Sequence, residues 1–302
     1  MQFVDTTIGI TGVTGFVGSE AAEYFRALGA DIRGLVRERV DQPEVEQIVG
    51  TINDQDAVRN LARGCDFIIH CVATHGPDFE TAERVNVDGS QTIGKAALAA
   101  GCDRFIHIST CGVYDLVDVD VVTEDTELWE YDSDSDLVYG VTKAEAERKL
   151  RSLQEGGLPL TIMRPPNILG AHPRSTFSHS VGEWLKEGDG SVGGEGDHTW
   201  PYVHVQSLLA AIEAAFEQPE SVGEAYTIVD GHTTWGDFIR EIADWMDAPL
   251  EIAEKSEPYD YFYGRFSSEK AERELQFETV VDYRTAMEET KRYLTESGFI
   301  TE

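Results

Sequence analysis

Residues Thr7–Gly18 read TIGITGVTGFVG, and the fold prediction starts from this stretch. It opens with a short β-branched run, which is typical of a buried parallel strand. The run breaks into glycines at positions 12, 15 and 18, and a helical pattern over 19–28 follows. Gly12 permits a sharp turn, Gly15 lets backbone N–H groups approach a pyrophosphate, and Gly18 lets the helix lie close to the strand. This order predicts a phosphate site at the helix start, against the alternative of an ordinary glycine-rich turn.

The rest of the N-terminal half repeats the alternation of strands and helices. Further strands are expected over 31–36, 46–51, 66–73, 104–109 and 158–163, with helices over 54–63, 83–100 and 136–154. Such alternation predicts an α/β fold with a doubly wound parallel sheet, a Rossmann domain. We expect this dinucleotide-binding domain over residues 1–163. Residues 164–302 should form mainly a smaller C-terminal substrate-binding lobe, with some segments returning to the sheet.

The charge of the chain is unusual. Fifty-six acidic residues face 24 basic ones, which gives a net charge of −32 over 302 residues, whereas an ordinary soluble domain carries a magnitude of ~2–8. Mutual repulsion would weaken such a fold in dilute buffer, and molar salt would screen it. This favours a halophilic protein, with an ordinary acidic protein as the alternative. Nucleic acid and anionic membranes are poor partners in either case.

The compartment is predicted from what the sequence lacks. No apolar run is long enough to cross a membrane, and the N-terminus leads directly into the first strand, so we expect no transmembrane segment and no signal peptide. The 4 cysteines are scattered without C-x-x-C spacing. They are expected to be buried thiols in a reducing cytoplasm, and no metal site is expected. His70, inside the strand over 66–73, is interpreted as a structural core histidine.

A tyrosine and a lysine form the second decisive pattern. Tyr139 and Lys143 are four residues apart in the helix expected over 136–154, so their side chains share one face. A tyrosine with a pKa of ~10 is a poor base at neutral pH. A neighbouring cation favours the phenolate and lowers that pKa, so that Tyr139 could take or give a proton. The alternative for this common spacing is an exposed helical pair.

These segments together resemble the extended short-chain dehydrogenases/reductases, the NAD-dependent epimerase/dehydratase family, over roughly residues 7–230. The stretch Ile108–Tyr114 is similar to the family's S-S-x-x-V-Y-G, in which the second hydroxyl residue binds the substrate oxygen. The resemblance therefore implies a catalytic set of Tyr139, Lys143 and Thr110, although a strand-end threonine can also bind its own backbone. It implies cofactor contacts from Gly12, Gly15, Phe16, Val17, Arg37, Ala73, Asn86, Tyr139, Lys143 and Pro165. It also implies a homodimer formed through helices near 85–100 and 138–153.

The choice of dinucleotide is predicted from the end of the second strand. NAD-using relatives typically place an acid there for the ribose hydroxyls, whereas this chain has Val36 followed by Arg37. An arginine suits a 2′-phosphate, so we expect NADP or NAD, with NADP slightly preferred. The alternative for Arg37 is a solvated charge on a loop.

Departures from the family pattern bear on the substrate. The two positions after the substrate threonine, Asp-Glu in many dehydratases, are Cys111 and Gly112. The arginine that nucleotide-sugar enzymes tend to place ahead of Y-V-H-V is Trp200, and an indole cannot replace a guanidinium that clamps phosphates. We therefore expect hydride transfer to or from a hydroxyl or keto group of a sugar-like or small carbonyl metabolite. A nucleotide-sugar epimerase is the main alternative, and a non-catalytic dinucleotide-binding redox sensor is a further one.

Overall fold

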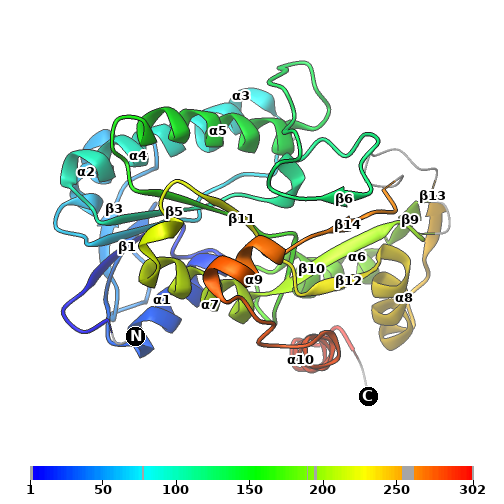
Figure 1. Cartoon of the computed structure of the whole chain (residues 1–302). Coiled ribbons are helices and arrows are strands. Elements are labelled where there is room, and N and C mark those ends of the chain that lie inside the picture. Colours follow the sequence, from blue (N-terminus) through cyan, green and yellow to red (C-terminus); the bar gives the residue numbers. More distant parts are fainter. Residues whose placement is uncertain (1–2, 77, 189, 194–195, 254–261, 301–302) are drawn as a thin grey trace. The chain divides into compact units, whose positions relative to one another are not determined.

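The main sheet of the computed structural model has seven strands (Figure 1). The structure describes residues 3–76, 78–188, 190–193, 196–253 and 262–300. The strands lie in the order β11-β7-β5-β4-β1-β2-β3, and the pairings from β3 across to β7 are all parallel. Their bounds are β1 Thr7–Thr11, β2 Asp31–Val36, β3 Glu46–Val49, β4 Phe67–His70, β5 Arg104–Ile108, β7 Leu160–Arg164 and β11 Ala225–Thr227. The doubly wound sheet is thus confirmed. Strand β1 lies between β2 and β4, where the strand order reverses and ligands bind in such sheets.

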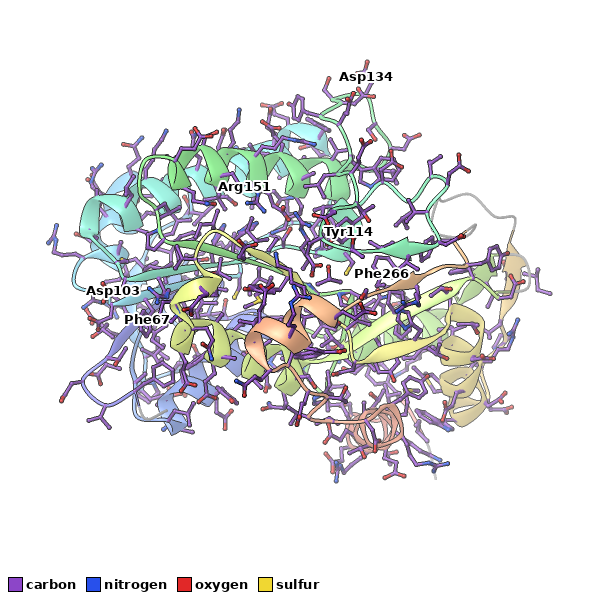
Figure 2. All side chains as sticks on the ribbon, viewed as in Figure 1. Phe67, Asp103, Tyr114, Asp134, Arg151 and Phe266 are labelled. Atoms are coloured by element: carbon purple, nitrogen blue, oxygen red, sulfur yellow. The ribbon has the colours of Figure 1, made fainter. Side chains whose placement is uncertain are left out.

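Helices cover both faces of this sheet (Figure 1). On one face lie α2 (Gln55–Ala62), α4 (Gly89–Ala100) and α5 (Val138–Gln154), and their apolar side chains share one buried cluster with the strands. On the other face, α1 (Phe16–Ala27) and the end of α7 (Val205–Glu217) bring phenylalanines together. The ring of Phe67, labelled in Figure 2, stacks on Phe216 with centroids 4.4 Å apart. Because both faces are covered, the strands are apolar on both sides.

The chain divides into two compact units. Unit 1 consists of Met1–Asp115, Glu127–Arg164 and Ala211–Tyr226, and unit 2 consists of Leu116–Thr126, Pro165–Ala210 and Thr227–Glu302. The expected dinucleotide-binding domain over 1–163 and substrate-binding lobe over 164–302 remain predictions.

Unit 2 is built from short sheets and helices around its own core. Strand β10 (Thr199–His204) pairs in parallel with β8 (Asn167–Leu169) and antiparallel with β12 (Gly231–Thr234). Two further parallel pairs join β9 to β13 and β6 to β14. The remaining bounds are β6 Val121–Val122, β9 Ser191–Gly193, β13 Glu251–Ala253, β14 Arg265–Phe266, α6 Val181–Glu187, α8 Trp235–Met246, α9 Glu269–Leu275 and α10 Tyr283–Glu296.

Two helices differ from the sequence expectation near the carboxyl edge of the main sheet. Helix α1 begins at Phe16, three residues earlier than the apolar pattern indicates, because Gly15 serves as its N-cap. The helix expected over 83–100 is instead a short α3 (Phe79–Ala82), a π-helical turn over Glu83–Asp88, and then α4. Single π-turns of this kind occur frequently at functional sites. No helix among the residues described in the ranges above has the length and apolar character needed to cross a bilayer.

Candidate active site

The glycine turn after β1 forms a cradle of backbone. Gly12 has a φ of +73°, and a Cβ there would lie 3.2 Å from the backbone of Cys71 and Val72 after β4. A Cβ on Gly18 would lie 2.1 Å from the Gly12 carbonyl oxygen, so only glycine lets α1 pack this close. Helix α1 therefore starts at the edge of the sheet with its first N–H groups, those of Phe16 and Val17 included, at its positive end. This arrangement fits a dinucleotide pyrophosphate.

A buried hydrogen-bond chain ties β1 to β4 beside this turn. The Oγ of Ser90 donates to the Asn86 carbonyl oxygen at 2.5 Å and so accepts from Nε2 of His70 at 2.9 Å. Nδ1 of His70 is then left to accept from the Thr11 hydroxyl at 2.6 Å. Burial lowers the pKa of His70 to about 3, with a smaller contribution from the Lys143 charge. His70 is a neutral structural residue, as the sequence interpretation held.

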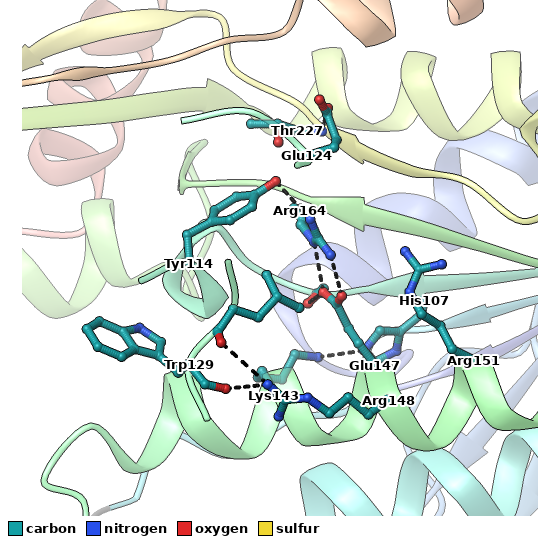
Figure 3. Close-up of polar contacts among 12 residues, drawn as sticks. His107, Tyr114, Glu124, Trp129, Lys143, Glu147, Arg148, Arg151, Arg164 and Thr227 are labelled. Atoms are coloured by element: carbon teal, nitrogen blue, oxygen red, sulfur yellow. Dashed lines mark hydrogen bonds and ion pairs between the residues drawn. The ribbon is translucent and has the colours of Figure 1, made fainter. Parts of the chain in front are cut away.

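Lys143 is fully buried under the carboxyl ends of the strands. Its Nζ donates to the Ile108 carbonyl oxygen at 2.6 Å. It also lies 3.4 Å from Nε2 of His107 (Figure 3). Burial lowers the pKa of Lys143 to about 8, and the negative charge of Glu147 opposes that lowering. Burial also holds the pKa of His107 well below its usual range, so the lysine faces a neutral imidazole. Lys143 therefore loses its proton at a lower pH than an exposed lysine does.

Thr110 and Tyr139 come from segments that two glycines bring together. A Cβ on Gly140, next to Tyr139 in α5, would lie 2.4 Å from the Gly112 carbonyl oxygen. This contact sets the turn after Thr110 against the first turn of α5. The Thr110 hydroxyl accepts from the Gly112 N–H at 3.1 Å, which uses a lone pair and not the O–H donor. Its neighbour Ser109 is buried and donates to Glu147 at 2.5 Å.

A histidine from the segment after β4, which the sequence analysis did not single out, lies on the Tyr139 ring. The imidazole of His75 stacks on the Tyr139 ring with centroids 4.0 Å apart and an interplanar angle of 26°. Asn86, which is buried in the π-turn, fixes Thr74, the residue before His75. Its side chain accepts from the Thr74 N–H at 2.8 Å and donates to the Thr74 carbonyl oxygen at 3.1 Å. The Asn86 amide also donates to Thr142 of α5 at 3.0 Å. A histidine just beyond a strand at the carboxyl edge was the signal that could have indicated it.

A second group missed from the sequence lies behind Lys143. Glu147, one turn further along α5, forms an ion pair with Arg164 at the end of β7, and Arg164 donates to the Tyr114 hydroxyl at 3.0 Å (Figure 3). Burial alone would lower the pKa of Arg164, but the Glu147 carboxylate more than offsets it and raises that pKa. The glutamate in Y-x-x-x-K-x-x-x-E and the arginine before the double proline carried this signal.

The other expected cofactor residues lie at the ends of strands. Arg37 is exposed directly after β2, and Ala73 is half-buried three residues after β4. Pro165 is buried and follows β7 directly. Among the residues that the structure describes, no group of three or more metal-ligating side chains is gathered in one place.

Trp200, which stands where nucleotide-sugar enzymes tend to have an arginine, is a core residue of unit 2. Only 6% of its surface is exposed. Its indole stacks on Phe238 with centroids 4.4 Å apart, and Phe177 meets it edge-on at 5.1 Å. This position supplies apolar packing and no positive charge.

Comparison with known proteins identifies the family of the chain and its fold. The family model "NAD dependent epimerase/dehydratase family" matches residues 8–229. The chain is 27% identical over 255 residues to a UDP-glucose 4-epimerase of Vibrio cholerae, covering 80% of this chain and 76% of that protein. It is 27% identical over 229 residues to a 4-hydroxy-2-methyl-3-oxo-4-farnesyl-3,4-dihydroquinoline-1-oxide ketoreductase of Stigmatella aurantiaca, covering 74% and 67%. The structure of a UDP-glucuronic acid 4-epimerase from Bacillus cereus, in complex with UDP-glucuronic acid and NAD, matches with a TM-score of 0.80 at 20% identity, covering 97% of this chain and 100% of that chain.

Proposed function

The chain belongs to the NAD-dependent epimerase/dehydratase family, and from that premise we propose that it transfers hydride to or from a hydroxyl or keto group of a sugar-like or small carbonyl metabolite. Its relatives are epimerases, dehydratases and reductases. The protein is accordingly an enzyme that works with a nicotinamide dinucleotide.

The observation that carries the proposal is the buried Lys143 one turn after Tyr139, at the edge of the sheet where the glycine cradle lies. The dinucleotide, when bound, supplies or accepts the hydride. Tyr139 gives the proton to the substrate oxygen during reduction, or takes it during oxidation. The Lys143 cation favours the phenolate form of Tyr139. The Thr110 O–H donates to the same substrate oxygen and orients it.

The side chains around this set favour a plain dehydrogenase or reductase. Cys111 and Gly112 supply no carboxylate for the elimination of a hydroxyl, and the Cys111 thiol donates to the Arg164 carbonyl oxygen at 3.2 Å. Trp200, packed in the core of unit 2, gives no charge for a diphosphate. A nucleotide-sugar epimerase remains the second candidate, because the Vibrio cholerae relative is one.

Three further features are part of the proposal. Arg37 stands exposed after β2 without an acid at the strand end, which supports a slight preference for NADP over NAD. The charge of −32 supports work in a cytoplasm of high salt. Helix α4 packs closely against α5 at Gly94, where an added Cβ would lie 2.7 Å from Leu150 Cδ2 and 2.9 Å from Leu153 Cδ1. We place the contact of a homodimer on that pair, as the family resemblance implies.

A substrate screen tests the proposal. Purified protein in molar KCl is offered sugars, sugar nucleotides and small ketones, while the absorbance of the reduced nicotinamide is followed. We expect net cofactor turnover with a substrate that carries no nucleotide, and a rate lower by ~10²–10⁴-fold with Tyr139→Phe. Interconversion of a sugar nucleotide without net cofactor consumption would identify the epimerase instead. Binding of the dinucleotide without turnover of any substrate would favour the sensor.

A further inference from the structure

We propose that His75 is a positioning residue of this active site, which fixes the plane of the Tyr139 ring and thereby aims its hydroxyl. The inference rests on the proposed role of Tyr139 as the proton carrier. The two rings lie nearly parallel, with centroids 4.0 Å apart and an interplanar angle of 26°. The imidazole therefore covers one face of the phenol. This face-to-face contact limits rotation of the phenol ring.

The position of His75 is imposed by the fold. Both backbone polar groups of Thr74 are held by the Asn86 side chain, at 2.8 and 3.1 Å. Asn86 is 0% exposed and also donates to Thr142, three residues after Tyr139 in α5. One amide thus joins the segment after β4 to the helix that carries the phenol. We call these contacts of the Asn86 side chain with Thr74 and Thr142 the Asn86 clamp. The clamp holds His75, the residue after Thr74, against the Tyr139 ring.

The chemistry explains why such a clamp matters. Tyr139 is half-buried in the first turn of α5, so its ring is not enclosed on all sides. A misplacement of ~1 Å at a reacting group can cost ~10²-fold in rate. Desolvation, and to a smaller extent the Lys143 charge, lower the pKa of His75 from its usual value, which favours the uncharged imidazole. A neutral ring restrains the phenol without adding a charge that competes with Lys143.

Three variants separate ring packing from other roles of the imidazole. His75→Phe keeps a flat ring against the phenol and should retain kcat within ~2-fold, while His75→Ala should lower kcat by ~10–100-fold with KM within ~3-fold. Phe79→Ala is the matched control, because Phe79 packs edge-on against Tyr131 at 5.7 Å in the same segment. It should leave kcat unchanged. Equal losses in His75→Phe and His75→Ala would overturn the proposal, since the ring nitrogens and not the stack would then be needed.

A spectrum of the protein without cofactor or substrate gives an independent readout. In protein labelled with ¹³C-tyrosine, the Tyr139 signal is identified by its loss in Tyr139→Phe. It should move in His75→Ala, where the ring current of the imidazole is lost, and stay in place in Phe79→Ala. An unmoved Tyr139 signal in His75→Ala would also overturn the proposal. Full turnover by Tyr139→Phe would refute the proposed function instead, and the spectrum would still report on the stack.

The Asn86 clamp adds a coupling test. Asn86→Ala should reproduce most of the loss of kcat seen in His75→Ala. The double variant should be little worse than His75→Ala alone, because both changes release the same ring. Losses that multiply in the double variant would show that Asn86 acts elsewhere and that the clamp is not what positions His75.

Discussion

The Glu147 carboxylate holds the Arg164 guanidinium at two points, with Oε1 3.0 Å from Nε and Oε2 2.6 Å from an Nη atom. Both side chains are buried, at 0% and 3% exposure. Lys143 lies one helical turn before Glu147 and is buried as well. One carboxylate therefore compensates two buried cations. Breaking a buried pair is costly because the remaining charge loses its partner.

The first prediction is that Glu147→Gln destabilises the protein strongly. The amide keeps the shape but removes the charge, so we expect a loss of about 3–5 kcal/mol in the free energy of unfolding. Urea denaturation at a fixed KCl concentration measures it. The matched control is Glu46→Gln, because Glu46 pairs with Arg33 at an exposed site and should lose no more than about 1 kcal/mol. Similar losses in the two variants would contradict the role of burial.

The second prediction concerns pH and Lys143. The pKa of this lysine is lowered by burial from 10.5 to about 8 in the folded protein. Between these two pH values the unfolded chain binds more protons than the folded one, so the contribution of Lys143 to stability rises with pH across this window. Relative to Lys143→Met, the wild type should gain on the order of 2–3 kcal/mol from pH 8 to pH 10.5. Other titrating groups act in both proteins and cancel in the difference. A constant difference would mean that Lys143 titrates normally.

The local patterns of unit 1 could be predicted because each has a steric or chemical cause that the sequence displays. Gly18 has to be glycine because an added Cβ would strike the Gly12 carbonyl oxygen, and Gly12 has a φ of +73°, which favours glycine. The spacing of Tyr139 and Lys143 has meaning only on a helix, and the helix is there. The strand expected over 66–73 pairs only as far as His70, because the chain leaves the ladder at the edge that forms the site.

The contacts made in three dimensions could not be predicted in the same way. The stack of His75 on Tyr139 joins residues 64 positions apart. The sequence pattern of neither segment indicates that the two are in contact. The Asn86 side chain, expected to contact cofactor, is engaged by Thr74 and Thr142, and its cofactor contact stays a prediction. Trp200 could be recognised as a departure from the arginine, but its burial depends on rings from other elements.

The third prediction tests the catalytic set. Tyr139→Phe removes only the proton carrier and should lower kcat by ~10²–10⁴-fold, the usual contribution of general acid–base catalysis. Cofactor affinity, measured by fluorescence titration, should scarcely change. Thr110→Val keeps the shape of the side chain and removes the hydroxyl, so it should lower kcat as well. Near-normal turnover by Tyr139→Phe would show that another group supplies the proton.

The fourth prediction is that salt stabilises the protein. The net charge of −32 produces repulsion that is screened as the Debye length falls to ~3 Å at 1 M salt. Thermal midpoints measured between about 0.1 and 3 M KCl should rise by tens of degrees. A series with sucrose in place of KCl separates charge screening from general preferential exclusion. A flat or falling KCl series would leave an ordinary acidic protein as the explanation.

The last prediction concerns the dinucleotide and rests on Arg37. Val36 ends β2 with 2% exposure, so no strand-end carboxylate is present to repel a 2′-phosphate. Arg37 follows it and is exposed, whereas Arg33 is already engaged, by Glu46 at 2.9 Å and by the Arg63 carbonyl oxygen at 2.5 Å. A charge-assisted hydrogen bond from Arg37 would contribute ~1.5–3 kcal/mol, which corresponds to roughly 10–150-fold in affinity. Molar salt screens an exposed pair and reduces this margin.

We therefore expect a preference for NADP without exclusion of NAD, and Arg37→Ala should weaken NADP binding while leaving NAD almost untouched. Titration of both dinucleotides into both proteins at one salt concentration measures the four affinities. Arg39→Ala is the matched control, because Arg39 is also exposed but lies further along the loop, and it should change neither affinity. Equal losses for the two cofactors in Arg37→Ala would mean that the guanidinium contacts the adenine and not the 2′-phosphate. A wild type that prefers NAD would refute the assignment, because the absence of an acid at the end of β2 would then have no consequence for the choice.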